Sequence, residues 1–359
     1  MRMALLRSIL AIGIVALLSL PSWAYRDHFT PEQKALLDKI QTVRIDAIAL
    51  TDQGAVDAAP IAELVARRMG ELGYAAVGEA GKPHDVVIKV KCEQRKIWEG
   101  TTTAGGDADL PDAPSRLWKG PACQMTYLLG NIKVKWQKEV RTEFEDAGQA
   151  AQSANVGDPG TYALDKLKNA LETYEFPLLL AAEWGQPERL LKLLDRSETS
   201  QAKKIKILSL LGEMQADEAL PKLREALKDR DLSKQAIGAM ANLGKESIPL
   251  LADIMNTSPH LELQAAAAKG LGQLGGTHGD ASVVPQLLAK LEDPKTDWSV
   301  LTEVAWALGK IPDKRSIQPL YDLDKKLAAL RDPENLSLRK LKEAVFWAIK
   351  QCDTWDQFS

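Results

Sequence analysis

Apolar and polar positions follow a helical period through the second half of the chain, and the pattern recurs five times after residue 186. Each copy begins with a proline-led apolar segment and continues into an alanine-rich segment that ends near a Leu-Gly pair. The prolines that start the copies are Pro187, Pro221, Pro249, Pro285 and Pro319. Their spacing of 28–36 residues is the length of one helix pair, so the pattern predicts a stack of about five helix pairs.

The alanine-rich segments align with one another. They are Leu232–Gly244, Leu263–Gly275 and Val300–Pro312, with looser copies at Lys203–Met214 and Leu341–Cys352. Apolar residues stand at helical spacing in them, and small residues stand where neighbouring helices would approach closely. An aspartate eight residues after the proline, at Asp195, Asp229 and Asp293, is placed to end the first helix or to cap the second.

The repeated unit reads roughly as xxPxLxxxLxD followed by VRxxAAxALGxIG. It resembles the HEAT repeats, in the short form found in phycobilisome-lyase-like proteins. The resemblance covers about half of the chain, and it implies an α-α superhelix, a HEAT- or armadillo-like α-solenoid, over residues 177–359. The arginine that is usual near the start of the second helix is replaced by Ser233, Gln264 and Leu301. The lyase activity of some relatives is therefore not carried over to this chain.

The preceding residues, 25–176, lack the repeat and contain β-branched segments that predict strands. The predicted strands are Val43–Leu50, Val86–Cys92, Gln124–Leu129 and Ile132–Val140, and the predicted helices are Pro31–Ile40, Val56–Leu72 and Tyr162–Tyr174. Apart from the first helix, their order is βαβββα, which predicts a small α+β sandwich with helices on one face of a mixed or antiparallel sheet. The segment Gly100–Pro121 is rich in Gly, Thr, Asp and Pro and predicts a long loop.

The first 24 residues have the pattern of a secretory signal. Two arginines, Arg2 and Arg7, precede an apolar run over residues 9–20, and Pro21-Ser22-Trp23-Ala24 follows. The pattern predicts cleavage after Ala24. An uncleaved anchor is the competing interpretation, although the run is shorter than the roughly 20 residues that span a bilayer. Export to the periplasm, with no stable membrane anchor after signal removal, is the simplest prediction, and residues 43–90 resemble the opening of exported envelope domains.

The three cysteines of the chain also bear on the prediction of export. Cys92 and Cys123 both lie in or beside predicted strands, and in an oxidising compartment they are candidates for one disulfide. Cys352 takes an apolar position of the last predicted helix, which favours a buried thiol. A catalytic cysteine is the alternative, but no histidine lies near it in the sequence.

Net charge, histidine spacing and the absence of catalytic motifs argue against several classes of function. The formal net charge is −3, and loss of the leader arginines makes it −5, which argues against non-specific binding of nucleic acid. The four histidines form no pair at metal-ligand spacing, and GxSxG, HExxH and Rossmann glycine motifs are absent from the sequence. The sequence thus predicts neither an enzyme nor a resident metal or cofactor.

The remaining candidate for a functional site is a surface of the predicted helix stack. In HEAT arrays the second helices line the concave side, and the candidate partner-binding residues on them are Lys234, Gln264, Lys269, Trp298, Glu303, Trp306, Arg339 and Lys342. The predicted function is that of an exported, non-catalytic scaffold or accessory protein that binds an envelope or periplasmic protein. The alternative is a lyase-like protein that holds a pigment or cofactor in the concave groove.

Overall fold

A computed structural model describes residues 29–78, 82–101, 115–130, 132–330, 332 and 334–356. The contacts divide these residues into two compact units, one ending at Arg189 and one starting at Leu190. The predicted signal peptide and its cleavage after Ala24 lie outside the described residues. Within the described ranges, no helix combines the length and the apolar character needed to cross a membrane.

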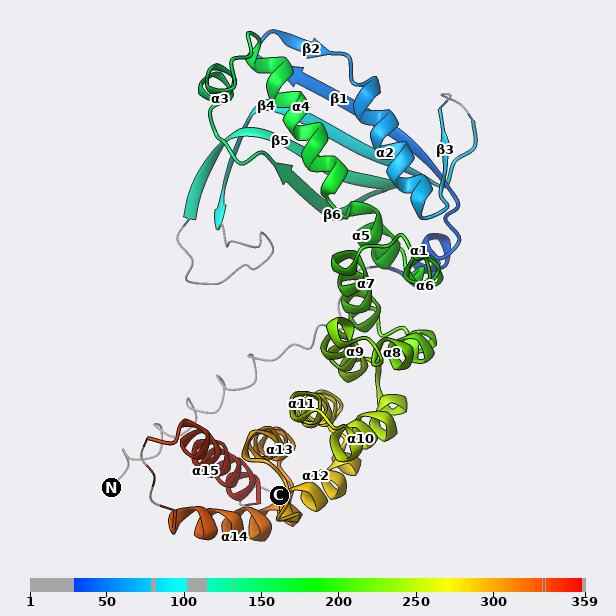
Figure 1. Cartoon of the computed structure of the whole chain (residues 1–359). Coiled ribbons are helices and arrows are strands. Elements are labelled where there is room, and N and C mark those ends of the chain that lie inside the picture. The colour runs from blue at the N-terminus through cyan, green and yellow to red at the C-terminus, as the bar shows by residue number, and fades with distance from the viewer. Residues whose placement is uncertain are drawn as a thin grey trace, which may run out of the picture. The chain divides into compact units, whose positions relative to one another are not determined.

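The α/β unit, Thr30–Arg189, is a mixed sheet with helices on one face (Figure 1). Its strands are β1 (Thr42–Thr51), β2 (Gly54–Val56), β3 (Ala75–Val77), β4 (Val86–Thr101), β5 (Ser115–Leu129) and β6 (Ile132–Arg141). Its helices are α1 (Pro31–Leu37), α2 (Ala59–Glu71), α3 (Ala147–Ser153), α4 (Pro159–Thr173) and α5 (Phe176–Glu183). The predicted α+β class and the order βαβββα are confirmed. The elements β2, β3, α3 and α5 are additional. The first three are too short to show a period in the sequence, and α5 is buried on every side.

The sheet has the order β2-β1-β4-β5-β6, with β3 paired to β1. Strand β1 runs parallel to β3 and β4, while β4, β5 and β6 form an antiparallel meander. Helix α2 packs against β1, and α4 packs against β4 and β5, so both helices bury the same face (Figure 1). The predicted loop Gly100–Pro121 needs correction, because β4 continues to Thr101 and β5 already starts at Ser115. The extended pairing places Trp98 directly opposite Trp118.

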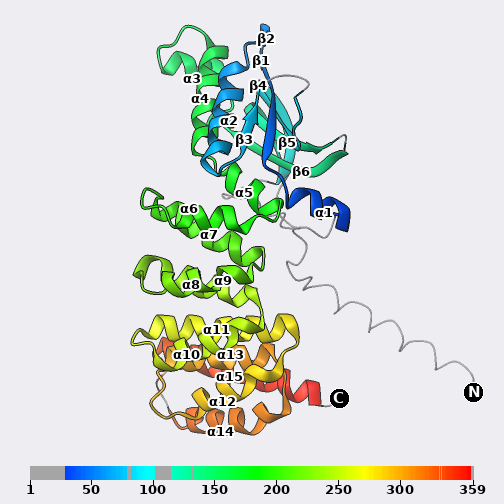
Figure 2. The same ribbon diagram turned by 90° about the vertical axis from the view of Figure 1, so that its right-hand side faces the viewer.

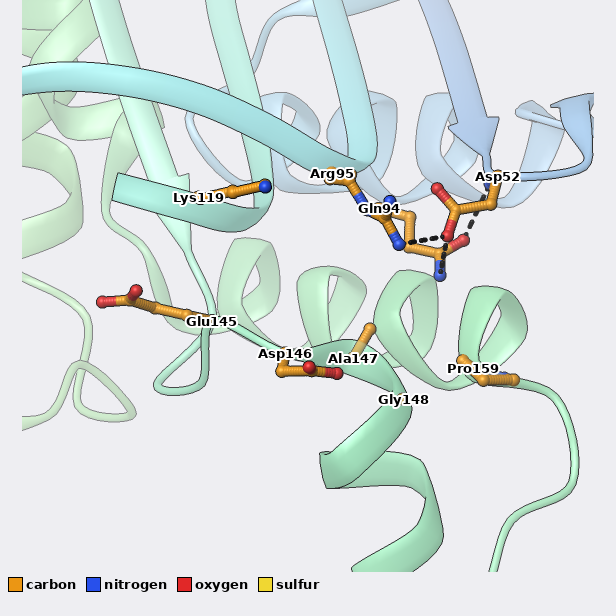
Figure 3. A pocket seen from close by; sticks show the side chains of 9 residues that line it. All are labelled: Asp52, Gln94, Arg95, Lys119, Glu145, Asp146, Ala147, Gly148 and Pro159. Carbon is orange, nitrogen blue, oxygen red and sulfur yellow. Dashed lines mark hydrogen bonds and ion pairs between the residues drawn. The ribbon is translucent and has the colours of Figure 1, made fainter. Parts of the chain in front are cut away.

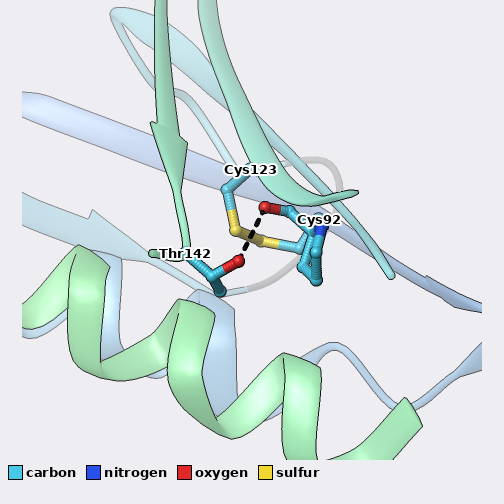
Figure 4. The surroundings of a disulfide bond; sticks show 4 residues. Cys92, Cys123 and Thr142 are labelled. Carbon is cyan, nitrogen blue, oxygen red and sulfur yellow. Dashed lines mark hydrogen bonds between the residues drawn. A yellow bond between two sulfur atoms is a disulfide. The ribbon is translucent and has the colours of Figure 1, made fainter. Parts of the chain in front are cut away.

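The predicted disulfide joins Cys92 of β4 to Cys123 of β5 (Figure 4). The two cysteines are Cα partners in the antiparallel register, and both are fully buried. Thr142, just after β6, donates its backbone N–H to the carbonyl oxygen of Pro121 at 3.3 Å beside the bond. The cross-link therefore lies within the hydrophobic core of the sheet, between strands that are already hydrogen-bonded.

A carboxylate fastens the start of β1 to the start of β4. The Oδ2 atom of Asp85 accepts hydrogen bonds from the backbone N–H groups of Gln41 and Thr42 and from the Thr42 hydroxyl, each at 2.8 Å. Burial alone would raise the pKa of Asp85, but these hydrogen bonds to the ionised form outweigh it and lower the pKa below its usual value. The ionised carboxylate thus stabilises the paired strands.

The lowered pKa predicts how stability depends on pH. A depressed carboxyl pKa contributes stability that is present above the unfolded-state value, about 3.8, and is lost as the pH falls through the folded-state value. We expect Asp85→Asn to be less stable than the wild type at about pH 7, with the difference shrinking towards about pH 3. Urea unfolding at both pH values measures this. A difference that is independent of pH would contradict it.

Helix α5 is buried on every side, and it belongs to the α/β unit. After it, the Trp184 ring contacts the rings of Tyr74 and Tyr127 edge-on, with centroids 5.1 and 5.7 Å apart. The Gln186 side chain donates to the carbonyl oxygens of Leu37 and Ile40 at 2.8 and 3.1 Å. Residues 177–189 thus pack with the α/β unit, although the repeat pattern predicted a boundary after residue 176.

The second unit is a stack of helix pairs (Figure 2). First helices are α6 (Pro187–Leu194), α8 (Leu220–Ala226), α10 (Ile248–Thr257), α12 (Val284–Glu292) and α14 (Ile317–Ala328), and second helices are α7 (Gln201–Glu213), α9 (Arg230–Leu243), α11 (Leu261–His278), α13 (Trp298–Lys310) and α15 (Leu336–Asp356). Each repeat proline lies within the first three residues of a first helix. Asp229 caps α9 by accepting from the N–H of Asp231. The predicted α-solenoid is confirmed.

Small residues explain the Ala- and Gly-rich character of the second helices. A Cβ atom on Gly212 would stand 2.7 Å from the Cα of Ala239, and one on Gly272 would stand 2.6 Å from the Cα of Ala307. A Cβ on Gly309 would meet the backbone of Ala348 at 3.0 Å. Successive second helices therefore touch through nearly bare backbone, and a larger side chain at these positions would separate them.

Two glycines of this layer are expected to respond oppositely to alanine. Gly272→Ala should destabilise the chain by about 2 kcal/mol, because its new Cβ clashes with Ala307 on α13. Gly238 is exposed on α9, and a Cβ there would have no atom within 4 Å, so Gly238→Ala should stabilise by about 0.5–1 kcal/mol through helix propensity alone. Thermal and urea unfolding measure both. A Gly272→Ala variant as stable as the wild type would refute the close approach.

Candidate functional site

The second helices form one layer of the stack, and their free side lines the inside of the curve that the helix pairs follow (Figure 1). We call this the second-helix surface. Its exposed and half-buried residues include Lys234, Gly238 and Asn242 of α9, Glu262, Lys269 and Gln273 of α11, Ser299, Glu303, Trp306 and Lys310 of α13, and Arg339, Lys340, Glu343, Phe346, Trp347 and Lys350 of α15.

Most of the predicted binding residues lie on this surface. Lys234, Lys269 and Arg339 are exposed there, and Glu303 and Trp306 are half-buried. Their role in binding stays a prediction.

The other three are placed differently. The Gln264 side chain donates to the carbonyl oxygen of Ser258 at 2.6 Å, in the turn before α11. The Lys342 ammonium donates to the carbonyl oxygen of Leu330 at 2.9 Å, which directs it towards the end of α14. Trp298 is the first residue of α13 and is half-buried, two turns away from Trp306. The structure thus gives Gln264 and Lys342 local hydrogen-bonding roles.

An aromatic pair marks the C-terminal end of the surface. The rings of Trp306 on α13 and Trp347 on α15 contact each other, with centroids 4.9 Å apart and planes inclined by 48°. Trp347 lies over Gly309, where a Cβ would stand 2.3 Å from its Cζ3 atom, so only glycine leaves room for the ring. Phe346 beside it is 59% exposed, and the Lys350 ammonium lies 4.8 Å from its ring centroid.

Trp347 and Phe346 were not among the residues predicted from the sequence. The signal was present, since Trp347 stands six residues after Leu341 just as Trp306 stands six residues after Val300, at the starts of two aligned segments. The last copy is too divergent for its exposed side to be assigned by pattern alone. The contact between the two rings therefore became visible only in the structure.

Charged residues border the aromatic pair on both sides. On α13, Glu303 precedes Trp306 by three residues and Lys310 follows it by four. On α15, Glu343 precedes Trp347 by four residues and Lys350 follows it by three. Residues three or four apart share one helix face, so each tryptophan lies between a carboxylate and an ammonium group. None of the four forms an ion pair with another described residue.

Cys352 lies beneath this region on the buried side of α15. It is 1% exposed, and its Sγ atom is 3.9 Å from the carbonyl oxygen of Leu308. Burial raises the pKa of the Cys352 thiol, which favours the neutral form over the reactive thiolate. This agrees with the predicted buried thiol.

A polar pocket of about 590 Å³ opens in the α/β unit (Figure 3). On one side of it, Gln94, which is 7% exposed, accepts from the backbone N–H of Asp52 at 2.9 Å and donates to its carboxylate at 3.2 Å. Arg95 also donates to that carboxylate, at 2.8 Å. The polar groups on this side thus satisfy one another. Lys119, Glu145 and the start of α3 line the rest, and the sequence pattern did not point to this pocket.

In the part of the chain that the structure describes, no group of three or more acidic, histidine or cysteine side chains is placed to hold a metal ion.

The chain is clearly similar to one known protein family. A family model of HEAT repeats matches residues 187–272 and 248–334. No curated protein matches the chain. Among solved structures, that of human deoxyhypusine hydroxylase in complex with glycerol is 17% identical, covers 58% of this chain and 90% of that one, and has a TM-score of 0.26. The family match and the stacked helix pairs together show HEAT repeats over residues 187–334.

Proposed function

We propose that this protein is an exported, non-catalytic scaffold that binds a partner protein of the cell envelope through its second-helix surface. The observation that carries the proposal is the aromatic pair of Trp306 and Trp347, half-exposed on that surface among charges that form no ion pair with another described residue. Tryptophan is enriched among the residues that dominate protein–protein binding. Charges without a partner in the same chain supply complementarity and orientation to an incoming protein.

Two further observations support the export part of the proposal. The leader pattern of residues 1–24 is that of a secretory signal. The disulfide between Cys92 and Cys123 is of a kind that persists in oxidising compartments and is rare where thiols are kept reduced. Scaffolding in the envelope accounts for the leader, the cross-link and the repeats together.

The proposal that a partner protein binds this surface is tested by capture from the native host. The full chain, tagged at its C-terminus, is crosslinked in cells and purified, and its companions are identified by mass spectrometry and by absorbance. A variant with Lys269→Glu and Lys310→Glu changes exposed charges of the second-helix surface at and beside the aromatic pair, whereas Lys325→Glu with Lys326→Glu changes exposed lysines of α14 by the same charge.

We expect one protein to be captured reproducibly, at least about tenfold less by the first variant and unchanged by the second. Equal capture by all three chains would overturn the proposal. A coloured or small-molecule companion without any protein would overturn it in favour of the pigment- or cofactor-holding alternative.

The export of the chain is tested by a separate measurement. Fractionation followed by N-terminal sequencing should find the chain in the periplasmic fraction with Tyr25 as its first residue. A chain that begins at Met1 in the membrane fraction would instead support the uncleaved anchor.

A further inference from the structure

The rows of charge beside the two tryptophans have a consistent polarity. Helices α13 and α15 run parallel, because Trp306 contacts Trp347 while Leu308, further along α13, meets Cys352, further along α15. Parallel helices in this register place Glu303 and Glu343 on one side of the aromatic pair, and Lys310 and Lys350 on the other. Next to the aromatic pair, the surface is therefore an apolar row between an acidic row and a basic row, and the exposed Arg339 and Lys340 lie one turn beyond Glu343.

We propose that this part of the second-helix surface receives one amphipathic α-helix of the partner protein, laid across α13 and α15. Its apolar stripe covers Trp306 and Trp347, its acidic edge faces Lys310 and Lys350, and its basic edge faces Glu303 and Glu343. This inference rests on the proposed function and specifies the chemistry of the partner.

The spacing of the two charged rows favours a helix over an extended strand. Seven residues separate Glu303 from Lys310, and seven separate Glu343 from Lys350. At about 1.5 Å of rise per residue, the rows lie roughly 10 Å apart along the helix axes. An α-helix with its side chains has a diameter of about 10–12 Å, so its two edges reach both rows at once. Successive side chains of an extended segment point to two opposite faces, so a segment that turns its apolar side chains towards the tryptophans turns its charged side chains away from both rows.

The aromatic pair gives the docked helix a rigid platform. The two rings contact each other, and Trp347 is seated on the bare backbone at Gly309, so little side-chain entropy remains to be lost on binding. The platform ends at α11, where the aligned position holds Lys269 in place of tryptophan. Because helices in contact lie about 8–10 Å apart, a span over two of them corresponds to roughly 13 residues of the docked helix.

Opposite charge on the two rows also fixes direction. Turning an amphipathic helix end for end exchanges its two edges, so only one direction matches both rows. The reverse direction brings like charges together, which costs binding energy. A partner helix that carries the same sign of charge along both edges is complementary to only one of the two charged rows.

The test uses the full chain and a synthetic peptide as probe. The peptide is an amphipathic helix of about 18 residues with a Leu/Phe stripe, glutamates on one edge and lysines on the other, and its binding is followed by fluorescence anisotropy. Lys310→Glu with Lys350→Glu removes the basic row. The control is Lys325→Glu with Lys326→Glu on α14, which has the same net charge.

We expect the first variant to bind the peptide at least about tenfold more weakly than the wild type, and the control to differ by less than about twofold. A second peptide with lysines on both edges should bind the first variant more tightly than the wild type. That reversal cannot arise from misfolding, so it separates a charge effect from a damaged surface.

Several results would overturn the inference. They are no measurable binding of the first peptide by the wild type, equal weakening by both variants, or no reversal with the second peptide. Self-association of the chain that is abolished by Lys310→Glu with Lys350→Glu, and that blocks the peptide, would assign the surface to a second copy instead. If the native partner is captured equally by the wild type and by that variant, this inference fails while the proposed function stands.

Discussion

Replacement of Arg189 by alanine is expected to lower the free energy of unfolding of the α/β unit by about 3–5 kcal/mol. The guanidinium is 8% exposed and donates to the carbonyl oxygens of Leu72 and Ile40, at 2.7 and 3.1 Å, and to the side chain of Gln41 at 2.7 Å. Its carbon atom also lies 3.9 Å from the ring centroid of Tyr74. Alanine removes this donor from the carbonyl oxygen of Leu72, leaves that of Ile40 with only the Gln186 side chain as donor, and removes the cation–π contact.

The control for Arg189 is Arg196→Ala, an exposed arginine beyond the same helix, which should change stability by no more than about 0.5 kcal/mol. Urea unfolding followed by tryptophan fluorescence compares the two, since Trp184 lies within the same packed region. Arg189→Lys should be intermediate, because an ammonium group cannot reach the acceptors at Leu72 and at Ile40–Gln41 in the way that the forked guanidinium does. A loss equal to that of Arg196→Ala would show that the buried guanidinium contributes nothing to the fold.

Removal of the disulfide is the second large effect. A chain with Cys92→Ala and Cys123→Ala is expected to lose about 3–4 kcal/mol of unfolding free energy, since the cross-link closes a loop of 31 residues in the unfolded chain. The expected loss includes no strain in the bond itself. The same change should appear when the wild type is unfolded with and without a thiol reductant.

Cys352→Ala separates the cross-link from the cavity that each smaller side chain leaves. Cys352 is as well buried as the paired cysteines but has no disulfide partner, so its replacement should cost only about 1 kcal/mol. Reductant should destabilise Cys352→Ala as much as the wild type and leave the double variant unchanged. Wild-type stability that is insensitive to reductant would contradict the expected role of the disulfide.

The sequence pattern predicted the structure correctly where the stabilising contacts join residues that are close together in the sequence. Each HEAT pair packs mainly against itself and its neighbours, so proline positions such as Pro221 and Pro285 predicted where first helices begin. Strand alternation likewise predicted the order βαβββα. Cys92 and Cys123 were expected to pair because both lie in or beside strands of an exported chain, and the register confirms it by placing them opposite each other.

Part of the candidate surface was also readable from the repeat. Alignment of the second helices assigned Lys269 and Trp306 to an exposed side, and both lie on the second-helix surface. The same alignment included Gln264 and Lys342, whose hydrogen bonds to nearby carbonyl groups depend on turn geometry that a pattern does not show. It missed Trp347, because exposure in a divergent last repeat depends on which neighbours are present.

The sequence by itself therefore determined the helix pairs, the strand order, the disulfide and the face on which most of the candidate residues stand, because periodicity and residue type report local structure. Tertiary structure alone decided that residues 177–189 pack with the α/β unit, that Trp306 and Trp347 meet, and that a polar pocket forms around Asp52 and Gln94. Each of these depends on contacts between residues far apart in the chain or on different helices. Arg189 shows the reason, since its acceptors at Leu72 and Ile40 lie more than 100 residues earlier in the sequence.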